Sequence, residues 1–121
     1  MTQKIMYIKN SYNWKETAVI LKVTSYVVYN QIAILLYTED GEYYADLSRY
    51  INILDKRNCM VVDTNNLPNA CEFIRKYKLW TIRWMCYAEF GSYPIYEMNL
   101  DELRKRDEEW VDKFINEKDE V

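Results

Sequence analysis

Residues 32–47 read Ile-Ala-Ile-Leu-Leu-Tyr-Thr-Glu-Asp-Gly-Glu-Tyr-Tyr-Ala-Asp-Leu and predict a β-hairpin. The segment Ile32–Tyr37 is apolar at every position and short for a helix, which favours a central strand buried on both faces. Asp40-Gly41 is a strong hairpin signal, because a tight turn needs a positive φ and glycine adopts it without steric cost.

Other strand-like segments lie on both sides of this hairpin. We expect further strands at residues 4–9, 17–23, 59–63, 80–90 and 93–98. In the returning strand of the hairpin, alternation places Tyr43, Ala45 and Leu47 on the apolar face. Pro94 lacks a backbone N–H, so its strand is expected at a sheet edge, or the proline at the strand start.

Two segments have helical spacing. One helix is expected over residues 67–77, with Pro68 in its first turn, where the missing N–H costs nothing. Asn99 is expected to cap a second helix at the C-terminus, whose apolar stripe Asp107 interrupts. The elements predict an α+β fold, with a largely antiparallel sheet of five to seven strands, one helix in the middle of the chain and one C-terminal helix. We expect a single domain over residues 1–121.

Size and charge limit the functional classes. The chain has 121 residues and a mass of 14.8 kDa, and half of its residues are apolar, which suits one core. Its net charge is −3, whereas duplex DNA binders are more often basic. Residues 101–121 hold nine acidic and five basic groups. This segment either mimics a phosphate backbone toward a basic protein groove or is a solvated helix face.

Much of the usual catalytic chemistry is missing. The chain has no histidine, which removes His-based acid–base catalysis and the commonest transition-metal ligand. Gly41 and Gly91 are the two glycines, too few for a dinucleotide or phosphate loop. We therefore expect a protein that is not an enzyme and holds neither cofactor nor metal. The remaining enzymatic route uses Asp63, Glu89 or a tyrosine and needs two carboxylates together in a cleft.

The cysteines and the N-terminus predict a cytoplasmic protein. Cys59, Cys71 and Cys86 have no Cys-x-x-Cys spacing, and an odd number suits a reducing compartment. We expect them to act as small buried hydrophobes. Residues 1–5 lack an apolar signal segment, and no window is apolar enough for a membrane span.

Aromatic content is the most unusual feature of the composition, with twelve tyrosines and four tryptophans. Tyrosine fills strand faces, where its β-propensity is high. Tyrosine and tryptophan are also enriched in protein interfaces, because they add large contact area at low entropic cost. Stacking on nucleic-acid bases is a third interpretation, which the acidic composition disfavours.

The expected strand over residues 80–90 carries a candidate partner-binding stripe. Its two faces alternate, with Trp80, Ile82 and Trp84 on one and the candidates on the other. The candidates are Arg83, Met85 and Tyr87. If the tryptophans face the core, this stripe is exposed and suits an Arg-aromatic hot spot; if a second helix covers it, the stripe is core.

Asp63-Thr64-Asn65-Asn66 lies between an expected strand and an expected helix. Loops at such places often hold ligands, so Asp63 and Asn65 are candidate partner-binding residues. The alternative is an Asx-type turn with a helix cap, in which these side chains satisfy backbone N–H groups. One carboxylate with two amides is too little for a metal site.

Several segments, taken in chain order, resemble one family of small bacterial proteins of unknown function. These segments are Ile32–Tyr37, Glu39–Glu42, Val62–Pro68, Phe73-Ile74 and Tyr93–Leu100. The similarity covers residues 17–103, and the Asp-Thr-Asn-Asn and Tyr-Pro-x-Tyr motifs are its most specific parts. Residues 80–90 depart from the pattern, because they lack the small and glycine residues usual before the Tyr-Pro motif, and the C-terminal helix extends further.

The resemblance implies a setting, since such proteins are carried on phages and conjugative elements of gut and Gram-positive bacteria. Small accessory proteins of mobile elements commonly act by binding. The leading hypothesis is therefore an anti-CRISPR-like inhibitor that occupies a functional surface of a CRISPR effector or another defence nuclease. Tyr93, Tyr96 and Arg83 are its expected partner contacts. The alternative is an accessory protein that binds a replication or transfer protein or forms a homodimer; no direct nucleic-acid contact is expected.

Overall fold

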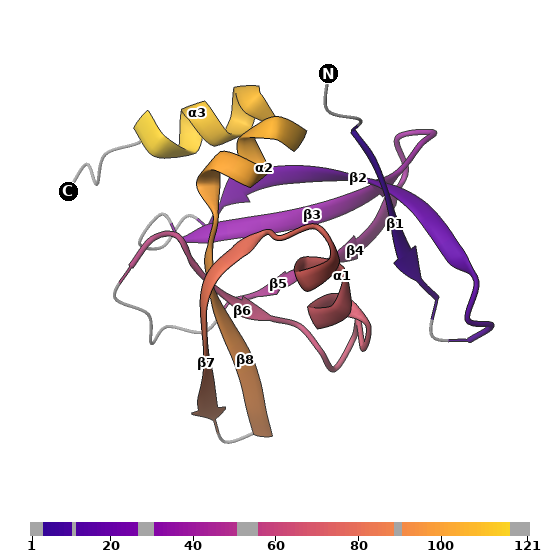
Figure 1. Ribbon diagram of the computed structural model, residues 1–121, viewed down its shortest axis with the longest axis horizontal. Helices are drawn as coiled ribbons and strands as arrows, with labels where there is room; N and C mark the ends of the chain where they lie inside the picture. The colour runs from indigo at the N-terminus through magenta and orange to yellow at the C-terminus, as the bar shows by residue number, and fades with distance from the viewer. Residues whose placement is uncertain (1–3, 11, 27–30, 51–55, 89–90, 117–121) are drawn as a thin grey trace.

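The computed structural model describes residues 4–10, 12–26, 31–50, 56–88 and 91–116, with the backbone alone for residues 83–88, 91 and 92 (Figure 1). The strands are β1 (Ile5–Lys9), β2 (Glu16–Ser25), β3 (Ile32–Thr38), β4 (Tyr43–Asp46), β5 (Ser48–Arg49), β6 (Cys59–Val62), β7 (Trp80–Ala88) and β8 (Gly91–Met98). The helices are α1 (Ala70–Lys76), α2 (Leu100–Arg106) and α3 (Glu108–Asn116). Each strand segment expected from the sequence is therefore present, although residues 89–90 of the strand expected over 80–90 lie outside the described residues.

The described strands form two four-stranded antiparallel sheets, ordered β1-β2-β3-β4 and β5-β6-β8-β7. The α+β class is confirmed, but the expected single sheet is wrong. The reason lies at Leu47, where the chain passes from one sheet to the other. The N–H of Leu47 donates to the Ile34 carbonyl of β3 at 2.9 Å, and its carbonyl accepts from the N–H of Asp63, beside β6, at 3.1 Å. One extended segment therefore serves both sheets at a corner.

The β3–β4 hairpin forms at the expected turn. Gly41 has a φ of +87°, and its N–H donates to the Thr38 carbonyl at 3.0 Å. The expected apolar face of the returning strand is wrong at one position, because Tyr43 is 59% exposed. A shift in the register with β3 leaves Tyr44 as an extra residue, and this bulge separates Tyr43 from the face of Ala45.

The alternation of β7 breaks at its start. Trp80 pairs with Met98 and Ile82 pairs with Glu97, so Thr81 is the extra residue of a β-bulge. Trp80 is half-buried against the core, whereas Ile82 is exposed. The expectation that these two side chains share a core-facing side is therefore wrong.

β8 lies between β6 and β7, so the expected edge position of the strand that contains Pro94 is wrong. The pairing of β8 with β6 ends at Ile95. Pro94 lies one residue beyond this end, where no β6 residue pairs with β8. A missing N–H is tolerated there because no ladder hydrogen bond with β6 is lost.

The middle helix is shorter than expected. It begins at Ala70 with Asn69 as its N-cap, so Pro68 precedes the helix instead of lying in its first turn. The residues before Pro68 form a turn, in which the Leu67 N–H donates to the Asp63 carbonyl at 2.9 Å.

The C-terminal segment forms two helices, so the expected single helix is wrong. Asn99 caps α2 as expected, and its side chain accepts from the Glu102 N–H at 3.3 Å. The helix ends at Asp107, whose Oδ2 accepts from the Val23 N–H of β2 at 2.9 Å. β1 pairs with β2 only as far as Ile20, so Val23 lies on an edge that β1 leaves open. The carboxylate supplies the acceptor that this N–H needs.

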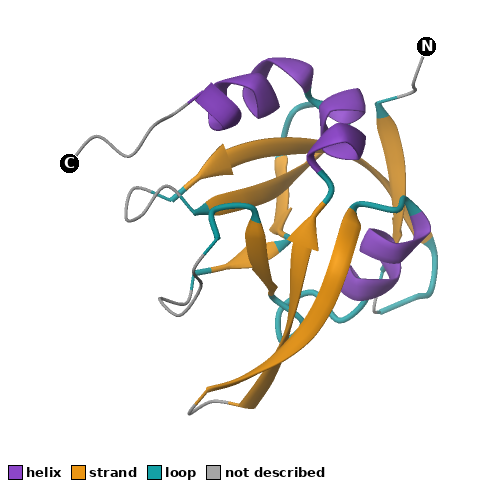
Figure 2. Ribbon diagram, turned by 60° about the vertical axis from the view of Figure 1, so that its left-hand side comes forward, coloured by secondary structure: helices purple, strands orange, loops and turns teal. Residues whose placement is uncertain are grey.

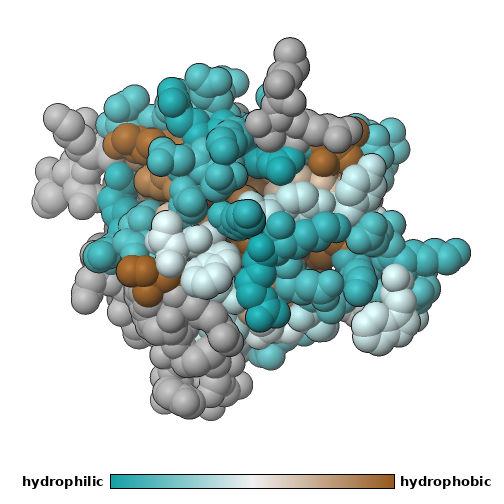
Figure 3. All heavy atoms as spheres, viewed as in Figure 1, coloured by the Kyte–Doolittle hydropathy of each residue, from teal (hydrophilic) through white to brown (hydrophobic). Residues whose placement is uncertain are grey.

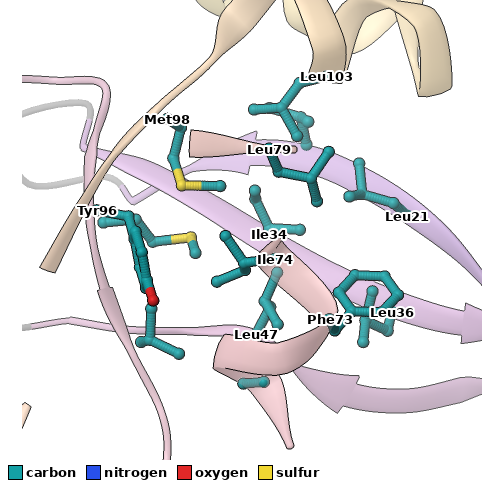
Figure 4. Close-up of a cluster of buried hydrophobic side chains, with 14 of the residues drawn as sticks. Leu21, Ile34, Leu36, Leu47, Phe73, Ile74, Leu79, Tyr96, Met98 and Leu103 are labelled. Atoms are coloured by element: carbon teal, nitrogen blue, oxygen red, sulfur yellow. The ribbon is translucent and has the colours of Figure 1, made fainter. Parts of the chain in front are cut away.

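One cluster of buried side chains joins both sheets and all three helices (Figure 4). Figure 4 shows Ile34 of β3, Ile74 of α1 and Tyr96 of β8 directed into it. A second cluster is smaller and consists of Cys59, Val61, Tyr93 and Ile95. Cys59 is buried, as expected, whereas Cys71 is half-buried against the main core; the Cys86 side chain lies outside the described part.

The α2–α3 helix pair and the β7–β8 hairpin lie at opposite ends of the molecule (Figure 2). The α2–α3 pair lies across one end of the first sheet, and the β7–β8 hairpin extends away from the opposite end of the molecule. None of the described helices is long and apolar enough to cross a membrane.

Candidate binding surface

The two tyrosines predicted as partner contacts on β8 are buried. Tyr93 is 1% exposed and Tyr96 is 0% exposed. They lie on opposite faces of β8, since Tyr96 belongs to the main core and Tyr93 to the second cluster. Their expected exposure is therefore wrong, because β8 is covered on both faces. Tyrosine here supplies packing volume to the core.

Arg83, Met85 and Tyr87 lie in β7 opposite Tyr96, Pro94 and Ser92 respectively. Their side chains lie outside what the structure describes, so their exposure stays a prediction. The strand order places β7 at the edge of its sheet, next to β8.

The loop after β6 is an Asx turn. Asp63 is 7% exposed, and its carboxylate accepts from the Asn66 N–H at 3.3 Å and from the Asn66 amide at 2.8 Å. Asn65 is exposed, and its amide donates to the Tyr93 hydroxyl at 2.7 Å. The expected exposure of Asp63 to a partner is therefore wrong, because its side chain closes the turn. Asn65 alone of this pair is accessible.

Some of the acidic residues of the C-terminal helices form ion pairs within these helices. Arg104 donates to both carboxylate oxygens of Asp112, at 2.6 and 3.1 Å, and lies 3.6 Å from Glu108. Lys105 pairs with Glu102 at 3.0 Å. The hydrogen bond from Arg104 holds the pKa of Asp112 below its usual value. These ion pairs are compatible with a solvated helix face, while the choice between this interpretation and phosphate mimicry stays a prediction, and Glu117, Asp119 and Glu120 lie outside the described residues.

A groove of about 280 Å³ lies between the first sheet and the junction of α2 and α3. Its floor comes from β2 and β3, where Ile20 and Tyr37 pair with each other on the side of the sheet that faces away from the core. Trp110 of α3 forms the wall of the groove. Arg106 and Asp107, at the C-terminal end of α2, also line the groove. Elsewhere, on the face seen in Figure 3, hydrophobic side chains form small separate patches among hydrophilic ones.

Cations gather at Trp110. The ammonium groups of Lys22 and Lys113 each lie 4.5 Å from the centroid of the indole ring. Lys22 comes from β2 and also lines the groove, together with Lys4 at the start of β1. A cation over an indole face is attracted by the ring quadrupole. Only Lys22 of this pair lines the groove, since Lys113 lines a separate small cavity with Thr24 and Ser25.

Sequence reasoning missed this groove. Its signal is the alternation of β2, in which Val19, Leu21 and Val23 are buried while Ile20 and Lys22 stay partly exposed on the other face. An apolar residue on the outer face of a strand is a weak indication of a binding surface. The opposing wall comes from a helix at the other end of the chain, which no local pattern reveals.

The groove is lined by both apolar and charged side chains. Apolar and aromatic side chains make its floor and wall, with a few charged groups at the rim, as in sites that hold side chains of a ligand. In the described part of the chain, no three cysteine, aspartate or glutamate residues lie close enough to hold a metal ion.

The structure is a two-sheet α+β fold with a groove on its surface. Residues 20–118 match the family described as Domain of unknown function (DUF4313), and the chain belongs to this family. The match confirms the resemblance to a family of unknown function. Comparisons with curated proteins and with solved structures gave no match.

Proposed function

We propose that this protein is a non-enzymatic binding module that recognises another protein through the groove at Trp110. The observation that carries the proposal is the groove itself, in which an apolar floor meets an aromatic wall and a cationic rim. Tryptophan and arginine at a partly buried site are typical of residues that dominate the binding energy of protein interfaces.

We further propose that a phage or conjugative element encodes the protein and that its partner is a host defence effector. The protein then acts like an anti-CRISPR protein, by occupying a functional surface of a CRISPR effector or another defence nuclease. The supports are the small size of the domain, the absence of histidine and the abundance of interface-type aromatic residues.

The test is protection of phage in a bacterium with an active defence system. Cells that express the wild-type protein should lose most of the defence, measured as the plaque count relative to cells with an empty vector. Trp110→Ala should restore the defence. Trp14→Ala is the matched control, because Trp14 is 73% exposed and does not line the groove.

Trp110 also packs against the core, so its removal affects folding as well as the groove. Lys22→Glu therefore serves as a second variant, with Lys15→Glu as its control, since Lys15 is exposed and lies outside the groove lining. Folding of each variant is checked by circular dichroism. Equal protection by wild type and both groove variants would rule out the groove as the functional surface.

The alternative function is an accessory role within the mobile element, in which the protein binds a replication or transfer protein or itself. β7 favours this alternative, because a strand of nine residues at a sheet edge offers backbone groups to a further strand. Elution as a stable dimer, with no effect on any defence system tested, is the outcome that would select it.

A further inference from the structure

The four edge strands of the two sheets differ in how they are protected. The edge of β1 is capped by a side chain at the end of α1, since the Tyr7 N–H donates to the Tyr77 hydroxyl at 2.7 Å. β4 is short and contains a bulge, and β5 consists of two residues. β7 has nine residues, and no described strand lies beyond it. An open edge of this length is a site at which a further strand can pair.

The sequence of β7 has few of the features that keep an edge strand from pairing. Such strands commonly carry several charges, a proline or a bulge. β7 has one charged residue, Arg83, and no proline, and its bulge at Thr81 lies near its start. The segment Ile82–Ala88 is consequently regular, and it runs along the β7–β8 hairpin that extends away from the rest of the molecule (Figure 2).

The direction of the backbone groups in β7 follows from the pairing of β8. The Met98 N–H donates to the Asn58 carbonyl, beside β6, at 2.8 Å. Because these directions alternate along an antiparallel strand, the odd-numbered residues of β8 bond to β7. Their partners are the even-numbered residues of β7 from Ile82 onward, so the odd-numbered residues beyond Ile82 direct their N–H and C=O groups to the open edge. These residues are Arg83, Met85 and Tyr87.

A second copy of β7 matches this edge about a two-fold axis. The regular segment Ile82–Ala88 is centred on Met85, so an axis at Met85 pairs its whole length, and every other axis pairs fewer regular residues. This register places Arg83 opposite Tyr87 of the second copy, and an arginine beside an aromatic ring is a favourable pair. An axis at Arg83 would instead place two like charges opposite each other.

We propose that the protein forms a homodimer in which β7 pairs antiparallel with β7 of a second copy, with the two-fold axis at Met85. The interface is isologous, so each copy closes the open edge of the other. The joined sheet then ends on β5 at both sides, and a strand of two residues is too short to recruit a third copy. The assembly therefore stops at two chains.

The dimer goes beyond the proposed function, because β7 contributes none of the residues that line the groove at Trp110. It gives the self-association of the alternative function a defined surface. A strand of an unrelated protein would meet the same backbone groups. The symmetric register of Ile82–Ala88 and the opposition of Arg83 and Tyr87, however, are specific to a second copy.

The test is the mass of the full chain in solution, measured by size-exclusion chromatography with light scattering over a dilution series. The wild type should have about twice the mass of one chain, 14.8 kDa. Met85→Lys and Met85→Glu each place two like charges opposite each other at the axis, and each should raise the dimer dissociation constant roughly tenfold or more. An equimolar mixture of the two variants should restore a dimer, because a lysine then lies opposite a glutamate.

Ile115→Lys and Ile115→Glu are the matched controls, because Ile115 is 48% exposed and lies on α3. Both should remain dimeric. The groove variant Lys22→Glu should also remain dimeric, so a failure of the groove function and a failure of the dimer are measured separately.

Hydrogen exchange of the wild type supplies a measurement that needs no variant. The amide protons of Arg83, Met85 and Tyr87 should exchange roughly tenfold more slowly in the dimer than in the diluted monomer. The amide proton of Trp84, which bonds to β8, should change less.

Three outcomes would overturn the inference. A wild type that is monomeric throughout the dilution series would leave the edge to a strand of another protein. A dimer that persists in both Met85 variants would place the interface elsewhere, and at the groove if Lys22→Glu dissociates it. Variants that stay monomeric when mixed would show that Met85 does not lie on the axis.

Discussion

In the first sheet, Tyr7, Tyr37 and Tyr43 lie on the side that faces away from the core, while in the second sheet Tyr93 and Tyr96 are buried on opposite faces of β8. The strands that carry these residues have similar sequence patterns. They differ in what covers them, since the helices and the second sheet pack on one face of the first sheet, whereas β8 is covered on both faces.

The difference shows that an excess of tyrosine has two physical causes in one small domain. On β8, tyrosine supplies volume to the core. On the first sheet, it supplies partly exposed aromatic surface, and of these three residues Tyr37 lines the groove together with Trp110. The aromatic count of the sequence therefore combines buried packing with exposed surface, and only the fold separates the two.

The strongest test of this comparison is truncation of one tyrosine from each sheet. Tyr96→Ala should lower the free energy of unfolding by about 3–5 kcal/mol, because it empties a fully buried site in the core. Tyr43→Ala should cost about 1 kcal/mol or less, since this side chain is mostly exposed and keeps an edge contact with Tyr37 and a hydrogen bond to Asp46. Urea denaturation followed by circular dichroism measures both.

Tyr12→Ala is the control, because Tyr12 is 96% exposed, and a change within about 0.5 kcal/mol is expected. A loss for Tyr96→Ala no larger than the loss for Tyr43→Ala would contradict the division of tyrosines into core and surface.

The strands and the β3–β4 turn could be predicted because they depend on local signals. β-Branched residues predict β2 and alternation predicts β7, and the positive φ at the turn after Asp40 requires a residue such as Gly41. Helix capping by Asn99 is local in the same sense. These features hold whichever sheet the strands join.

Features that depend on contacts between distant residues could not be predicted. A bulge at Thr81 or Tyr44 leaves no distinct residue type in the sequence, yet each reverses the faces of the residues beyond it. The corner at Leu47 divides the expected single sheet into two. The groove needs Lys22 and Trp110 side by side, and the bond that fixes this junction joins Val23 and Asp107, which are 84 positions apart.

Asp107→Ala tests whether the C-terminal helices are held to the first sheet by this bond. Removal of the carboxylate leaves the part-buried Val23 N–H without its acceptor, at a cost of about 1–3 kcal/mol in unfolding free energy. Asp107→Asn retains an acceptor oxygen and should recover much of the loss. Chemical denaturation of both variants provides the measurement, and an unchanged midpoint for Asp107→Ala would show that packing alone holds the helices.

Gly41→Ala tests the turn that presents Tyr43 and one end of the groove. Apart from the two chain neighbours of Gly41, no atom of the described residues lies within 4 Å of the position that a Cβ would take, so the cost comes from the positive φ. About 1–2 kcal/mol is expected for an alanine in this conformation. Gly41→Asn should cost less, because asparagine tolerates such a conformation better. Thermal denaturation compares the two, and equal costs would point to a cause other than the backbone conformation.

The smallest effect is expected on the paired side of the C-terminal helices, at Asp112. Its pKa should lie below 3.8, because Arg104 donates two hydrogen bonds to the charged form. A depressed pKa contributes stability above the unfolded value, and this contribution is lost as the pH falls through the folded value. Since both side chains are exposed to solvent, the gain is minor and falls with added salt.

An NMR titration of the Asp112 carboxyl carbon measures the midpoint directly. Arg104→Gln should return the midpoint to about 3.8, with little change in overall stability. An unchanged midpoint would mean that Arg104 and Asp112 are not paired in solution. The carboxylates of this face would then be free to present negative charge to a basic partner, and phosphate mimicry by α2 and α3 would become the stronger interpretation of the acidic C-terminal segment.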